Sequence, residues 1–177
     1  MKKSFLALLA ATSLLLMGCT QNIKHQTSDT EDEEEEVALT PDEQATRDIV
    51  GTWSYSYEDN DGTPTNNTYD FNEDGTLVET VTATYPGGTL KMVSNGKWKV
   101  RDNIIEFLYE LDDCKAYLDG VINDEFTQAL REEDKNENLK VRDYKERGET
   151  YGFPIIRVSA NELVLNMQGE EITLTKQ

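Results

Sequence analysis

Two acidic loops in the sequence carry oxygen-bearing side chains of the kind that bind calcium. Residues 70–75, Asp-Phe-Asn-Glu-Asp-Gly, match the first half of a calcium loop, with oxygen ligands at positions one, three and five and glycine at six. Position twelve, where a bidentate glutamate is needed, is Val81. A second loop, residues 58–62, has Tyr57 where its first ligand should stand. The pattern favours a hairpin turn over a calcium site at residues 70–75, and no metal ligands are assigned.

The side chains that enzymes use most often for proton transfer and nucleophilic attack are scarce. His25 is the only histidine and precedes the predicted domain, so that domain cannot form a histidine-based triad, zinc site or general base. Cys114 lacks a histidine partner and lies on an apolar stripe, which favours an inert buried thiol over a nucleophile. Carboxylates are abundant, and counting them does not exclude a glycosidase pair. We nevertheless expect a protein that is not an enzyme, with no catalytic residues and no cofactor.

A row of aromatic side chains at alternating positions is the best candidate for a ligand-binding surface. Buried tyrosine hydroxyl groups need hydrogen-bond partners, so several on one inward face indicate a wet or partly open cavity. Glu79 is the one charge on an otherwise apolar strand face, and it either lines the mouth of a cavity or points away. The alternative is that the aromatic residues are ordinary core and rim. The candidate ligand site comprises Trp53, Tyr55, Tyr57, Glu79, Tyr85, Met92, Trp98, Phe107 and Tyr109.

The N-terminal residues have the pattern of an export signal. Met1-Lys2-Lys3 is positively charged, and residues 5–17 are uncharged over a length that suits a secretory signal rather than a membrane span of about 20 residues. Leu16-Met17-Gly18-Cys19 resembles the lipobox of bacterial lipoproteins. The resemblance implies that residues 1–18 are removed as a lipoprotein signal peptide and that Cys19 carries acyl chains such as palmitate. Two or more such chains anchor a protein stably in a membrane.

The charge of the chain limits its partners. Without Lys2 and Lys3 the mature chain has 15 basic and 35 acidic residues, a formal charge of −20, so binding to nucleic acid is excluded. Anionic lipid headgroups should repel it, so the lipid on Cys19 must supply attachment to the membrane. Residues 19–47 include six consecutive acidic residues, 31–36, and are predicted to be a disordered acidic tether. The same acidic residues resemble a signal for the outer face of the outer membrane, and we expect the protein in the cell envelope, at the outer membrane or on the surface.

From residue 49 onward the hydrophobic pattern has a period of two, which is typical of half-buried strands. Turn residues separate the segments, as at 73–75, 86–88, 101–103, 159–161 and 168–170. The pattern predicts an all-β fold of eight antiparallel strands, and closure into an up-and-down barrel would remove the exposed edges.

Residues 112–150 interrupt this pattern between the fifth and sixth predicted strands. Asp113 could cap a short helix that ends near Gly120, and Asn123 could cap a second one. Beyond Glu132 the apolar stripe fades, and Gly148 is a plausible end. We expect a short helical insertion on a β scaffold.

Gly51-Thr52-Trp53 at the head of the first strand resembles the Gly-x-Trp signature of lipocalins. The segments 71–76, 96–100 and 161–165 are similar to hairpins of lipocalin-like domains in bacterial lipoproteins. The resemblance covers residues 48–177 apart from the insertion, and implies a lipocalin-like barrel that either is filled by its own side chains or holds one small ligand. We therefore expect an envelope lipoprotein that binds a small apolar or amphipathic molecule. The alternative is a protein-interaction module with a filled barrel that uses residues 112–150 or the open barrel end.

Overall fold

The computed structural model describes residues 38–59 and 61–177. The predicted signal peptide, Cys19 and His25 therefore lie outside the described residues. The helices are α1 (Pro41–Ile49) and α2 (Asp124–Glu146), with one 3₁₀ turn, η1 (Leu111–Asp113). The strands are β1 (Gly51–Glu58), β2 (Pro64–Phe71), β3 (Thr76–Tyr85), β4 (Gly88–Arg101), β5 (Ile104–Tyr109), β6 (Lys115–Leu118), β7 (Val121–Ile122), β8 (Phe153–Val158), β9 (Glu162–Met167) and β10 (Glu170–Lys176). No helix in the described ranges is both long and apolar enough to cross a membrane.

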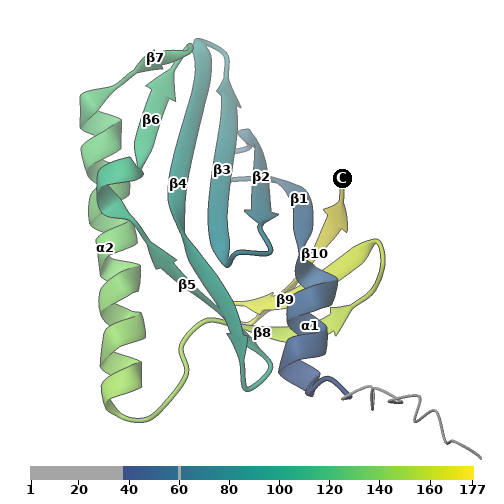
Figure 1. Ribbon diagram of the computed structural model, residues 1–177. Helices are drawn as coiled ribbons and strands as arrows, with labels where there is room; N and C mark the ends of the chain where they lie inside the picture. The colour runs from purple at the N-terminus through teal and green to yellow at the C-terminus, as the bar shows by residue number, and fades with distance from the viewer. Residues whose placement is uncertain (1–37, 60) are drawn as a thin grey trace, which may run out of the picture. The chain divides into compact units, whose positions relative to one another are not determined.

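Eight of the strands close into an antiparallel barrel (Figure 1). Strands β1 to β5 follow one another as neighbours, β5 pairs with β8, and β8 to β10 lead back to β1. These are the eight strands that the alternating pattern predicts, so the predicted fold class is confirmed. Neighbouring strands of the barrel also follow one another directly in the sequence, except for β5 and β8, which the insertion separates.

The barrel is closed at one end and open at the other, because its strands differ in length. Strand β10 pairs with β1 only at Trp53 and Ser54, and β8 pairs with β5 only at Ile104 and Ile105. Strands β1 to β4 continue past these contacts. We call the closed part the base half and the continuing part, with β6 and β7, the mouth half.

Large apolar side chains fill the base half. Trp53, Phe71, Leu77, Ile105, Leu163, Leu165 and Leu174 are fully buried. Helix α1 closes this end, with Ile49 buried and its carbonyl oxygen accepting a hydrogen bond of 2.6 Å from the Trp53 indole N–H. The Asp42 carboxylate accepts hydrogen bonds from the backbone N–H groups of Asp102 and Asn103, which attaches α1 to the β4–β5 turn.

The predicted extent of the disordered acidic tether is wrong at its C-terminal end. The sequence predicts residues 41–47 as part of that tether, whereas they form most of helix α1 in the structure. The helix begins with a capping box between Thr40 and Glu43 and has Pro41 in its first turn. Burial of its apolar face against the barrel base then offsets the cost of ordering it.

The insertion is a β-hairpin followed by one long helix. The predicted second helix is confirmed, since the Asn123 side chain accepts a hydrogen bond from the Phe126 N–H and α2 runs for 23 residues. The predicted first helix is wrong, because residues 115–118 form β6 and pair with Leu90–Val93 in the mouth half of β4. This part of β4 has no partner in β5, and the unmet backbone groups of its edge favour a strand there. Asp119 and Gly120, both with positive φ, make the turn into β7.

Candidate functional site

The structure divides the nine predicted ligand-site residues into three groups. Trp53, Trp98 and Phe107 are core residues with at most 6% of their surface exposed, so they do not line an open site. Tyr57 and Tyr85 are each 43% exposed at the open end, and Met92 is partly buried on β4. The remaining residues, Tyr55, Glu79 and Tyr109, come together inside the mouth half of the barrel. We call these three, with Asn67 and Tyr69, the Glu79 cluster.

Glu79 is positioned by the register of three neighbouring strands. It lies opposite Tyr69 on β2 and Ser94 on β4. One carboxylate oxygen accepts a hydrogen bond of 2.6 Å from the Tyr109 hydroxyl, and the other accepts one of 2.9 Å from the Asn67 side-chain nitrogen. Of the two orientations that the sequence left open for Glu79, the inward one is therefore correct.

The environment of Glu79 opposes its negative charge. Burial raises the pKa of this carboxyl group above its ordinary value of 4.5, and the hydrogen bonds from Tyr109, Asn67 and Tyr69 offset this only in part. The side chain nevertheless keeps some accessible surface. A carboxyl group whose pKa is raised by burial is a candidate functional residue.

Asn67 and Tyr69 are members of the cluster that the sequence did not single out. Asn67 is only 5% exposed, and its side-chain nitrogen donates to both Glu79 and the Tyr69 hydroxyl. Its side-chain oxygen has no hydrogen-bond partner among the described residues. Such an atom costs free energy unless a water molecule or ligand pairs with it. Their inward positions on β2 follow from the same alternation that places Phe71 in the core.

A second buried carboxylate, Asp134 of α2, lies beside the cluster. It accepts hydrogen bonds from the Ser94 hydroxyl at 2.7 Å and from the Cys114 thiol at 2.9 Å. Burial raises the pKa of Asp134, and its charge in turn contributes to the raised pKa of Glu79. Burial and the neighbouring Asp134 raise the pKa of Cys114 to about 12, which keeps it a thiol at neutral pH. Cys114 is buried, as predicted, although it lies between η1 and β6 rather than on a helix.

Helix α2 forms one wall of the mouth half, packing against β4, β5 and β6 (Figure 1). The Asn138 side chain makes the two backbone hydrogen bonds that a neighbouring strand would make with β5 at Tyr109. Its oxygen accepts from the Tyr109 N–H and its nitrogen donates to the Tyr109 carbonyl oxygen, both at 2.8 Å. This contact fixes the backbone of the residue whose hydroxyl group binds Glu79. The same helix brings Glu133 close enough to contribute to the raised pKa of Tyr57, after burial and the charges of Asp59 and Glu79.

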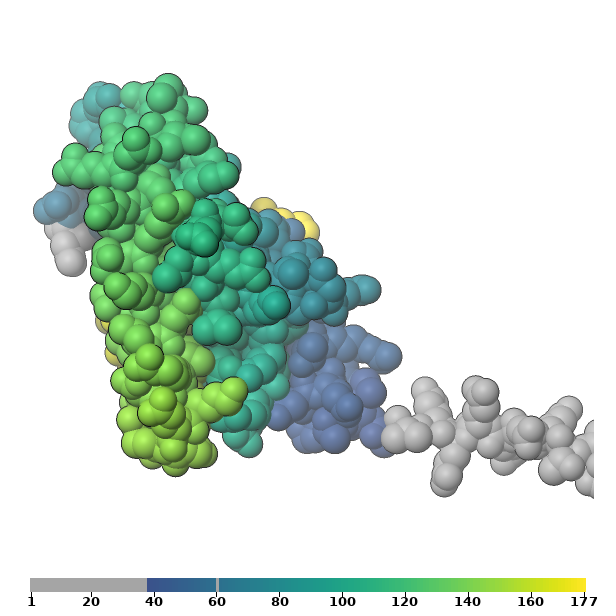
Figure 2. Space-filling model, turned by 60° about the vertical axis from the view of Figure 1, so that its left-hand side comes forward, coloured from purple at the N-terminus to yellow at the C-terminus, as the bar shows by residue number. Residues whose placement is uncertain are grey.

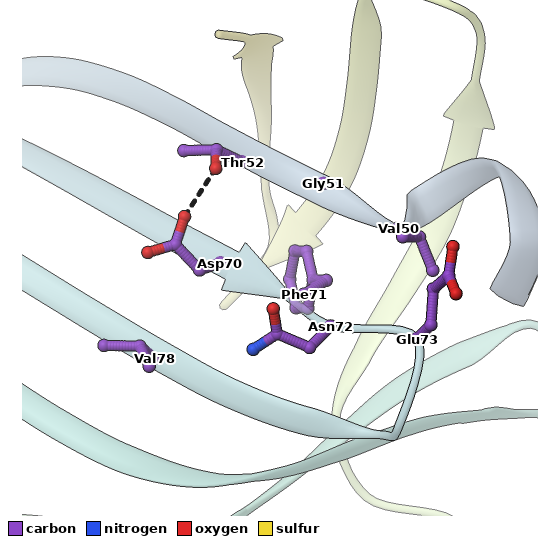
Figure 3. A pocket seen from close by; sticks show the side chains of 8 residues that line it. All are labelled: Val50, Gly51, Thr52, Asp70, Phe71, Asn72, Glu73 and Val78. Carbon is purple, nitrogen blue, oxygen red and sulfur yellow. Dashed lines mark hydrogen bonds between the residues drawn. The ribbon is translucent and has the colours of Figure 1, made fainter.

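The structure confirms the hairpin turn that the sequence predicts at residues 70–75. Phe71 pairs with Leu77 across the β2–β3 turn, and the Asp74 carboxylate accepts hydrogen bonds from the Thr76 N–H and hydroxyl groups. In the open hollow of about 410 Å³ beside this turn, Asp70 binds the Thr52 hydroxyl while Asn72 and Glu73 point elsewhere (Figure 3). No group of three or more potential metal ligands is found within residues 38–59 and 61–177. This hollow lies outside the barrel, and its polar groups do not converge on one point.

A second open hollow, of about 440 Å³, lies on the outer side of β1, β2 and β3 near the mouth. Its lining is mainly Ser, Thr and Asn side chains, so it offers little apolar surface to a ligand. The Glu79 cluster is therefore the part of the described structure in which buried polar groups and apolar walls meet.

No model of a known protein family matches this sequence, and no curated protein matches it.

Proposed function

We propose that this protein is a lipid-anchored lipoprotein of the cell envelope whose lipocalin-like barrel binds a small amphipathic molecule without acting as an enzyme. The observation that carries the binding proposal is the contrast within one barrel: apolar side chains fill the base half, whereas hydrogen-bonding groups line the mouth half. The packed base half leaves no place for a ligand, so we place it in the mouth half. The apolar Val81 and Met92, which face each other beside Asn67, would contact its hydrocarbon part.

Uptake of N-phenyl-1-naphthylamine, a neutral dye whose fluorescence rises in apolar surroundings, tests the binding proposal. Tyr55→Ala, at the mouth, should weaken uptake, because the Tyr55 ring belongs to the Glu79 cluster and stacks on Tyr57. Tyr144→Ala on α2 is the matched control and should leave uptake unchanged. A folded wild-type protein that takes up no dye would count against a small-molecule carrier.

The anchor rests on the sequence of residues 16–19. Cys19→Ala should move the protein from the membrane fraction to the soluble fraction, because it removes the site of acylation. Cys114→Ala is the control, since this is the other cysteine of the chain and its side chain is buried. Persistent membrane association of the Cys19 variant would overturn the lipoprotein assignment, whatever the dye experiment shows.

A protein-interaction module remains the second candidate function, and one feature favours it. The insertion exposes four large apolar side chains close together in the sequence: Leu118, Val121, Ile122 and Phe126. Helix α2 also lies along one face of the domain (Figure 2). If this surface is the working one, Val121→Ser combined with Ile122→Ser should abolish capture of a protein partner and leave dye uptake unchanged.

A further inference from the structure

We infer that the ligand of the mouth half is an organic cation, a primary ammonium group carrying a hydrocarbon chain, with its nitrogen bound between Glu79 and Asn67. The inference rests on the proposed small-molecule function and specifies the chemistry of its ligand. It depends on three features of the Glu79 cluster: an excess of hydrogen-bond acceptors, negative charge without a counter-ion, and aromatic walls.

The cluster is short of hydrogen-bond donors. The Tyr109 hydroxyl and the Asn67 nitrogen already donate to Glu79, and the Asn67 nitrogen also donates to Tyr69. The Tyr69 hydroxyl adds a further hydrogen bond to Glu79, and the Tyr55 hydroxyl is the one other donor of the cluster, so acceptor lone pairs still outnumber donor protons. What remains is the Asn67 side-chain oxygen, buried and without a partner among the described residues, and the unused lone pairs of the carboxylate. A ligand with several N–H groups on one atom satisfies both acceptors at once, as a primary ammonium group does.

The negative charge of the site also lacks a basic partner. Neither Glu79 nor Asp134 takes part in an ion pair with any described residue, and the ion pairs that the structure contains all lie elsewhere. None of the inward-facing positions of β1 to β6 in the mouth half is a lysine, arginine or histidine. A cation is therefore attracted, whereas an anion of the same shape is repelled.

The aromatic residues suit a cation with an apolar tail. Tyr55 and Tyr57 stack with their ring centroids 5.5 Å apart, and aromatic faces attract ammonium groups. The row of side chains nearer the opening runs from Tyr55 through Asn67 to Val81 and Met92, as the register of β2, β3 and β4 shows. The hydrocarbon chain would lie along Val81 and Met92, with Tyr57 and Tyr85 at the exit.

Four ligands with the same eight-carbon chain test this inference by calorimetric titration of the folded wild-type protein below their micellar concentrations. Octylammonium should bind at least about tenfold more tightly than 1-octanol, the factor expected for a single hydrogen bond to a charged group. Octyl sulfate should bind more weakly than either. Octyltrimethylammonium, which has the charge but no N–H group, should bind less tightly than octylammonium because it cannot pair with the Asn67 oxygen.

Glu79→Gln keeps the shape of the side chain and removes its charge. In this variant the affinity for octylammonium should fall to that for 1-octanol, whereas Glu171→Gln, an exposed carboxylate on β10, should change nothing. Equal binding of octylammonium and 1-octanol by the wild type would overturn the inference and leave the proposed function standing. Binding of none of the four ligands would overturn both, and the wild-type series decides this even if the variant does not fold.

Discussion

The base half of the barrel buries Trp53, Phe71 and Leu165 almost completely, whereas the mouth half places Glu79, Asn67 and Tyr109 on the same inner face. Strands β1 to β5 contribute to both halves with one alternation of inward and outward side chains. In the base half most inward positions belong to the apolar core. In the mouth half the inward positions include a carboxylate whose burial is unfavourable and an amide oxygen without a partner. Groups that cost stability in this way are typical of functional sites.

The largest expected difference between the two halves is in the effect of losing an aromatic ring. Trp53→Ala in the base half should lower the free energy of unfolding by about 3–5 kcal/mol, because it leaves a cavity in a packed core and removes the indole contact to Ile49. Tyr85→Ala at the mouth, where the ring is 43% exposed, should cost less than about 1 kcal/mol. Urea unfolding followed by far-UV circular dichroism measures both. Similar losses for the two variants would mean that the halves are equally packed.

A smaller effect is expected where α2 meets the barrel. Asn138→Ala removes the two hydrogen bonds to the backbone of Tyr109, and at 0.5–1.5 kcal/mol each the loss should be about 1–3 kcal/mol. Asn136→Ala is the matched control, since the same residue type lies exposed on the same helix. Equal unfolding free energies for the two variants would show that Asn138 does not support the mouth half.

The smallest effect should have the opposite sign. The pKa of Glu79 is raised in the folded state, so the folded protein holds this proton more tightly than the unfolded chain. Stability is therefore lost as the pH rises from about 4.5 through the folded pKa, and Glu79→Gln should be as stable as the wild type at pH 4 and more stable at pH 8. The titratable groups that face Glu79 are Tyr55, Tyr69, Tyr109 and Asp134. Burial also raises the pKa of Asp134, so the Glu79→Gln variant should keep part of this pH dependence.

Thermal melting of both proteins between pH 4 and pH 8 measures this effect, with Glu171→Gln as the exposed control. A variant that is less stable than the wild type at pH 8 would mean that the ionised carboxylate stabilises the fold. Glu79 would then be a structural residue rather than part of a binding site.

The barrel could be predicted because its information is local. Alternation identifies each strand, and turn residues such as Asp102-Asn103, both with positive φ, separate neighbours. The two errors have physical causes. Helix α1 follows an acidic run and is stabilised by the barrel base, although the capping box of Thr40 and Glu43 could have indicated it. Residues 114–121 have helical spacing, but pairing of β6 with β4 overrides that preference.

The candidate site was only partly predictable, because most of its contacts join residues that are far apart in the sequence. Glu79 stands out within its own strand as a charge among apolar neighbours. Its partners come from other elements, and their contacts depend on strand register and on the path of α2. Asp134 and Asn138 lie in the part of the helix where the apolar stripe fades, so no periodic pattern marks them. Trp53, Trp98 and Phe107 share the alternation of the site residues but belong to the core, because alternation identifies the inner face and not its depth.

The central claim is that the mouth half binds ligands while the base half supplies stability. A titration of the ¹⁵N-labelled protein with octylammonium, followed by two-dimensional NMR of the backbone amides, tests it most directly. The account predicts that chemical-shift changes concentrate at Tyr55, Asn67, Glu79 and Tyr109, with Leu165 and Leu174 of the base half unchanged. Changes that are largest at Val121, Ile122 and Phe126 of the insertion, or at the base, would contradict it.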